Sequence, residues 1–184
     1  MDWQTTITIS KLDAAERQIN TAVRLYFNDG DPVSIHTLSA AAFEILKDLD
    51  KKGPKTGTFY DLVNRYVGPE ERDAVMKTFK QAQNLFKHAD QDPDATLDFS
   101  LAESEMFLLA ACDKFRELSG TITAEIATFL TWWSLQNPDL LSPEATKLFS
   151  TIRFPEKFEP IQGREFFNRF IAHFAAGISK SIST

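Results

Sequence analysis

The sequence predicts a single all-α domain, a bundle of seven or eight helices that spans residues 1–184. Three observations favour this fold class. Apolar residues recur at intervals of three and four along most of the chain, which is the spacing of one helix face. Glycines and prolines fall mainly between these segments, where helices end. A length of 184 residues with no shift in composition suits one domain.

The first two helices are expected to form an antiparallel hairpin. Asp13 is the expected cap of the first helix, and residues 28–30 are its stop. The second helix opens at Asp31-Pro32, a capping residue followed by proline at the first helical position. The short linker places the two helices side by side. Their apolar stripes are Leu12, Ala15, Ile19, Ala22, Val23, Tyr26 and Phe27, and Ile35, Leu38, Ala42, Ile45, Leu46 and Leu49.

The middle of the chain is expected to hold a loop and two further helices. Residues 51–58 contain glycines, a proline and lysines, which is typical of a loop. A short helix is expected at about 59–66. A longer helix follows from Gly68-Pro69, with apolar positions up to Ala89, and the aspartates and proline of residues 90–94 end it.

The second half of the chain is expected to hold four more helices, after a brief extended piece at 96–99. Ser100 and Glu103 match a capping box, a serine with a glutamate three residues later, and Gly120 is the expected stop of this helix. The remaining helices are expected at about 123–135, 142–152 and 163–179. In the adjacent pair Trp132 and Trp133, one ring is expected in the core and the other along a groove or partner surface, because neighbouring positions on a helix diverge by about 100°.

Composition limits the function classes. The net charge of −6 disfavours binding of nucleic acid, because an acidic protein repels a polyanion at long range. The lone Cys112 excludes an intramolecular disulfide and suits a reducing cytoplasm, so a cytoplasmic location is expected. The N-terminal residues lack a signal-peptide pattern, and no apolar run reaches the length of a membrane span. No phosphate-binding loop or other cofactor motif is present, so no cofactor is expected.

Five polar or ionisable residues are the candidate ligand-binding set: His36, Asn84, Lys87, His88 and Asp90. Asn84 and His88 are four residues apart and are expected on one helix face. An amide beside an imidazole can orient a substrate and move a proton near neutral pH. The same pair also suits a structural role at a helix C-terminus. His36 is expected either to fill a gap beside small residues or to face a pocket.

The segment Asn84-Leu85-Phe86-Lys87-His88 resembles a degenerate form of the motif of HEPN domains. These are small helical bundles, often dimeric, and many are metal-independent ribonucleases. The resemblance implies that His88 acts as the general acid or base and that Asn84 positions the phosphate. Gln83 occupies the place of the family's arginine, so Lys87 or Arg65 would have to supply the positive charge. More broadly, the first half of the chain resembles a group of uncharacterised bacterial helical proteins, through patterns such as residues 16–18, 24–27 and 31–38 together with 84–90.

Three functions follow from these observations. The favoured hypothesis is a non-enzymatic binding or protein-interaction module with a polar pocket near His36, Asn84 and His88, which binds a small ligand or a protein. The first alternative is the HEPN-like ribonuclease. The second is a metal-dependent enzyme, in which His36 and His88 meet Asp90 or Glu44, although no metal-binding spacing is present in the sequence. No catalytic residue is assigned, and the sequence leaves open whether the protein is an enzyme.

The last helix has a wide apolar surface flanked by basic residues. Phe166, Phe170 and Phe174 follow one another at intervals of four. A core helix is the first interpretation, and a helix shared across a homodimer is the second.

Overall fold

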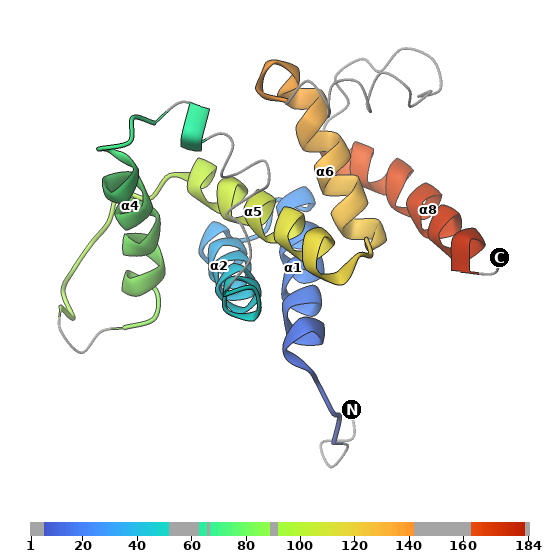
Figure 1. Ribbon diagram of the computed structural model, residues 1–184, viewed down its shortest axis with the longest axis horizontal. Helices are drawn as coiled ribbons and strands as arrows, with labels where there is room; N and C mark the ends of the chain where they lie inside the picture. Colours follow the sequence, from blue (N-terminus) through green and yellow to red (C-terminus); the bar gives the residue numbers. More distant parts are fainter. Residues whose placement is uncertain (1–5, 52–62, 66, 89–91, 142–162, 183–184) are drawn as a thin grey trace.

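The computed structural model describes residues 6–51, 63–65, 67–88, 92–141 and 163–182, and its fold is an all-α bundle, as predicted. Figure 1 shows the elements in a row, with α4 at one end, α1, α2 and α5 in the middle, and α6 and α8 at the other end. No strand occurs among the described residues. The helices with described bounds are α1 (Lys11–Phe27), α2 (Pro32–Leu49), α4 (Arg72–Leu85), α5 (Leu101–Ser119), α6 (Ala124–Gln136), the 3-10 helix η1 (Pro138–Leu140) and α8 (Gly163–Ile182).

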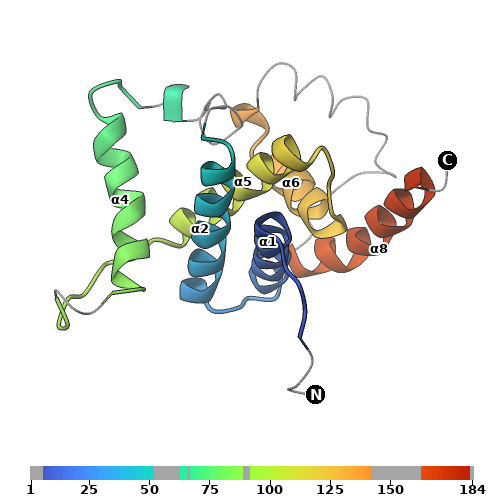
Figure 2. The same cartoon turned by 60° about the horizontal axis from the view of Figure 1, so that its bottom comes forward.

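The predicted hairpin of α1 and α2 is confirmed, and its turn depends on a glycine. The backbone N–H of Gly30 donates to the carbonyl of Leu25 at 2.8 Å. A Cβ on Gly30 would lie 2.9 Å from the Leu25 side chain, so a larger residue does not fit without a shift. Asp31 caps α2 by accepting from the N–H of Ser34 at 2.7 Å, and Pro32 takes the first helical position. The two helices lie side by side (Figure 2).

Two capping predictions need correction. The cap of α1 is Ser10 and not Asp13: the two residues form a reciprocal capping box, in which Asp13 accepts from the N–H of Ser10. The expected capping box of α5 is not formed, because Ser100 makes no side-chain capping bond and Glu103 is bonded to it only through the backbone. Gly120 ends α5 in the left-handed conformation, as expected.

The start and end of α4 differ from the prediction. The helix begins at Arg72, after a turn that includes Gly68 and Pro69, and it ends at Leu85. The guanidinium of Arg72 donates to the carbonyls of Asn64 and Val67 at 3.1 and 3.2 Å, so it fastens the start of α4 to the preceding segment. The helix expected at 142–152 and most of the one at 59–66 lie outside the described residues.

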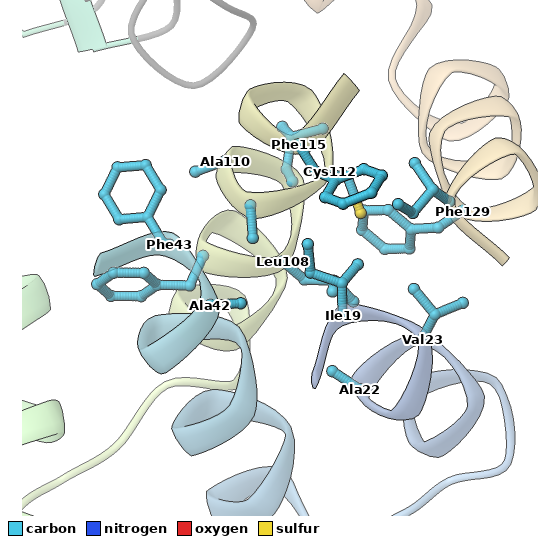
Figure 3. Packing of buried hydrophobic residues seen from close by; sticks show 14 of the residues in the cluster. Ile19, Ala22, Val23, Ala42, Phe43, Leu108, Ala110, Cys112, Phe115 and Phe129 are labelled. Atoms are coloured by element: carbon cyan, nitrogen blue, oxygen red, sulfur yellow. The ribbon is translucent and has the colours of Figure 1, made fainter. Parts of the chain in front are cut away.

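The core lies between α1, α2 and α5. In Figure 3, Ile19 and Val23 of α1, Leu108 and Cys112 of α5 and Phe129 of α6 gather between their helices, and all five are buried. The predicted stripe of α1 is confirmed. In α2 the stripe ends earlier than expected, because Leu49 is 50% exposed. Four residues outside the predicted stripe are also buried in this helix: His36, Ser39, Ala40 and Phe43.

A second aromatic cluster joins α1 to α6 and α8. Phe27 is buried there and stacks on Phe167 with ring centroids 5.1 Å apart. Trp133 is in the core, as expected for one of the two rings, whereas Trp132 is partly buried and packs against Tyr26 and Phe27. The expected groove or partner surface at the second ring stays a prediction. The cluster consists of Tyr26, Phe27, Phe129, Trp132, Phe166 and Phe167.

Two adjacent charged residues of α5, Asp113 and Lys114, are buried, and Lys114 links this helix to α2. The side chain of Lys114 is 7% exposed and forms ion pairs with Asp50, at the end of α2, and with Glu117, one turn further along α5. Burial alone would lower the pKa of the ammonium, but the hydrogen bonds to the two carboxylates outweigh it, so the pKa of Lys114 is raised. This cluster ties the end of α2 to α5.

Candidate functional site

His36 is the most unusual side chain among the candidate residues. It lies one turn into α2, on the helix face that packs toward α5, and its relative exposure is 0%. The neighbouring buried position is Ser39, whose hydroxyl donates to the carbonyl of Ile35 at 2.8 Å and is thereby satisfied within the helix. The imidazole is therefore a polar ring placed in the core.

Three phenylalanines from different parts of the chain surround this imidazole. The ring centroids of Phe99 and Phe107 lie 5.0 Å from that of His36, and the centroid of Phe86 lies 5.5 Å away. All three contacts are edge-to-face, with interplanar angles of 77° to 90°. Phe86 and Phe99 also contact each other in this geometry, at 5.1 Å. We call these four rings the His36 cluster.

Neither ring nitrogen of His36 has a hydrogen-bond partner among the described residues. A neutral imidazole offers one donor and one acceptor, and leaving such groups buried and unpaired costs about 1–3 kcal/mol each. Burial lowers the pKa of His36 to about 4, and the positive charge of Lys87 adds to the effect. At neutral pH the ring is therefore uncharged.

Three other candidate residues lie on the surface at the end of α4. Asn84, Lys87 and His88 are exposed, and the backbone N–H groups of Lys87 and His88 both donate to the carbonyl of Asn84, at 3.1 and 3.0 Å. The ring of Phe86 connects this turn to His36. Asp90 lies outside the described residues.

The candidate residues therefore divide into two layers. His36 is inside, beneath the ring of Phe86, and makes no hydrogen bond to Asn84, Lys87 or His88. Phe86, Phe99 and Phe107 were not predicted as neighbours of His36 from the sequence. The available signal was weak: the spacing along α4 placed Phe86 with the apolar positions, and nothing in the sequence paired it with α2.

Basic side chains without ion-pair partners among the described residues lie on α4 and on the turn that follows it. Lys77, Lys80 and Lys87 are exposed, and none of them forms a salt bridge within that part of the chain. Many basic side chains of the other helices do have a carboxylate partner: Arg24 with Glu125, Lys47 with Glu44, Lys114 with Asp50 and Glu117, Arg116 with Asp113, Arg164 with Asp29, and Arg169 with Glu165.

The described residues do not form a metal-binding cluster of three or more His, Cys, Asp or Glu side chains. Glu44, one of the ligands considered for such a site, is paired with Lys47. His36 is enclosed by rings that offer no metal ligand. His173, on α8, is exposed.

Comparisons with known proteins do not assign the chain to a class. The chain matches no protein-family model, and no curated protein or solved structure matches it significantly. Within the described residues, no helix combines the length and the apolar character that crossing a bilayer requires.

Proposed function

We propose that the protein is a non-enzymatic binding module and that its ligand site is the His36 cluster, with Asn84, Lys87 and His88 at the entrance. The buried imidazole with two unpaired nitrogens carries this proposal. A ring kept only for packing gains nothing from nitrogen atoms, and their desolvation costs stability. A ligand that bonds to these nitrogens explains why a histidine occupies the position.

The entrance to such a site follows from the burial of its rings. Phe107 is buried, whereas Phe86 and Phe99 are only partly buried. These two rings cover His36 on the side where the chain passes from α4 to α5. A rotation of either partly buried ring would open a path to the imidazole. The polar residues on the adjacent turn, Asn84, Lys87 and His88, would then lie at its rim.

Binding is tested by the imidazole NMR signals of His36 in ¹⁵N-labelled protein. We expect these signals to shift when small ring compounds (phenol, benzoate and benzylamine) are added together at millimolar concentration. The signals of the exposed His173, on α8, serve as the internal reference, and the variant His36→Phe assigns the resonances. If no compound moves the His36 signals more than those of His173, the proposed site does not exist.

A HEPN-like ribonuclease is the second candidate, and the basic face of α4 favours it. Asn84 and His88 are exposed beside Lys87, in agreement with the roles that the resemblance implies. Gln83, at the place of the family's arginine, is buried and does not face this surface. Lys87 is therefore the candidate for the missing positive charge.

We expect any ribonuclease activity to depend on His88 and not on His36. Cleavage of a fluorescent single-stranded RNA should fall by about 10²-fold or more in His88→Ala, because this residue would supply the general acid or base. His36→Phe is the matched control and should retain the activity. Equal activity in the parent and in His88→Ala would assign the cleavage to a contaminant, and no cleavage by the parent would remove this candidate.

A further inference from the structure

We propose that the His36 cluster takes a flat aromatic ring that carries an anionic group, with the ring against the phenylalanines and the anion paired with Lys87. This inference rests on the proposed function above and specifies the chemical class of its ligand. Two sets of observations carry it: the geometry of the aromatic rings around His36 and the charges at the end of α4.

The ring preference follows from the walls of the site. The three aromatic contacts of His36 within the described part of the chain are edge-to-face at centroid distances of 5.0 to 5.5 Å, and Phe86 meets Phe99 in the same way. Aromatic rings favour this arrangement over face-to-face stacking because ring edges are positive and ring faces negative. A ligand ring that takes the place of Phe86 or Phe99 can keep the same contacts with the rings that remain.

The imidazole adds a polar requirement to this apolar wall. Its two nitrogens have no partner among the described residues, although the ring is completely buried. A purely hydrocarbon ring would leave both nitrogens unpaired, whereas a ligand with a hydrogen-bonding group would satisfy at least one of them. The site therefore favours a substituted ring over an unsubstituted one.

The anionic group follows from Lys87. This lysine directly follows Phe86, is exposed, and forms no ion pair with a described residue. Its charge already acts on His36, whose pKa it lowers in addition to the effect of burial. A cationic ligand would meet repulsion from Lys87, whereas a carboxylate or phosphate would neutralise it. The preceding lysine in the chain is Lys80, which lies on α4 seven residues earlier.

The ligand class is tested with three monosubstituted benzenes of similar size and different charge. Benzoate, benzamide and benzylamine are titrated separately while the imidazole signals of His36 are recorded. We expect benzoate to bind most tightly and to raise the pKa of His36, because its negative charge offsets that of Lys87. The variant His36→Phe has no such signals, so its binding is followed by isothermal titration calorimetry beside the parent, and it should lose the binding.

Two lysine variants separate this inference from the proposed function. Lys87→Gln should weaken the binding of benzoate by about two- to fivefold, which corresponds to one exposed ion pair, and should leave benzamide unchanged. Lys80→Gln is the matched control and should have no effect on either compound. If benzamide or benzylamine binds as tightly as benzoate, or if Lys87→Gln binds benzoate normally, the ligand class is wrong while the site stands. If no compound shifts the His36 signals, both proposals fail.

Discussion

Lowering the pH from about 7 to about 4 should reduce the free energy of unfolding by about 3 kcal/mol through His36 alone. The folded-state pKa of His36 is lowered to about 4 by burial, and its ordinary value is 6.5. The unfolded chain therefore binds a proton below pH 6.5 that the folded protein does not accept until about pH 4. This contribution is fully present above pH 6.5 and is lost as the pH falls through the interval.

The measurement is urea unfolding across this pH range for the parent, His36→Phe and His88→Ala. Carboxylates also titrate there, so the difference between proteins is the quantity of interest. His36→Phe should lack the steep part of the pH dependence, whereas His88→Ala, which removes an exposed histidine, should retain it. Parallel curves for the parent and His36→Phe would show that the imidazole is protonated in the folded protein at no extra cost.

Replacing Phe27 with alanine should lower the free energy of unfolding by about 3–5 kcal/mol, which is typical of a buried aromatic residue. Phe27 ends α1 and contacts rings of both α6 and α8, so its removal leaves a cavity where three helices meet. Gly163, the first residue of α8, also lies close to this ring: a Cβ built on it would lie 3.4 Å from the Phe27 ring. The first turn of α8 therefore lies directly against this side chain.

The matched control for Phe27→Ala is Leu101→Ala. Leu101 begins α5 and is 65% exposed, so its truncation should change the free energy of unfolding by no more than about 0.5 kcal/mol. Both variants are compared by urea unfolding at neutral pH. Similar losses at the two positions would mean that the aromatic cluster does not hold α6 and α8 to α1.

The elements that the sequence predicts correctly depend on local chemistry. The α1–α2 hairpin follows from Asp31-Pro32 and from the glycine at the turn, and each acts within a few residues. The incorrect predictions also came from local patterns, which do not show the contacts that form in the folded protein. The pattern of Ser100 and Glu103 is a capping box by spacing alone, and the capping bond is absent from the structure. Leu49 continues the apolar stripe in the sequence, but it lies at the exposed end of α2.

The candidate site was only half predictable for a physical reason. The sequence selects His36 because a lone histidine stands among apolar residues, and it selects Asn84 and His88 by their spacing. The contacts of His36 with Phe86 and Phe99 join residues that are far apart in the chain, and only the packing of α2, α4 and α5 determines them. No local pattern encodes which ring meets which.

The uneven distribution of ring types has a spectroscopic consequence. The described tryptophans, Trp132 and Trp133, lie on α6, at the opposite end of the molecule from α4 (Figure 1), whereas the His36 cluster contains only phenylalanines besides the imidazole. In a variant with Trp3 replaced by phenylalanine, tryptophan fluorescence thus reports on the packing of α6 against α1 and α8, and it is insensitive to the detachment of α4. A far-UV circular dichroism signal that decays before this fluorescence during denaturation would identify the α4 end as a separate unfolding unit.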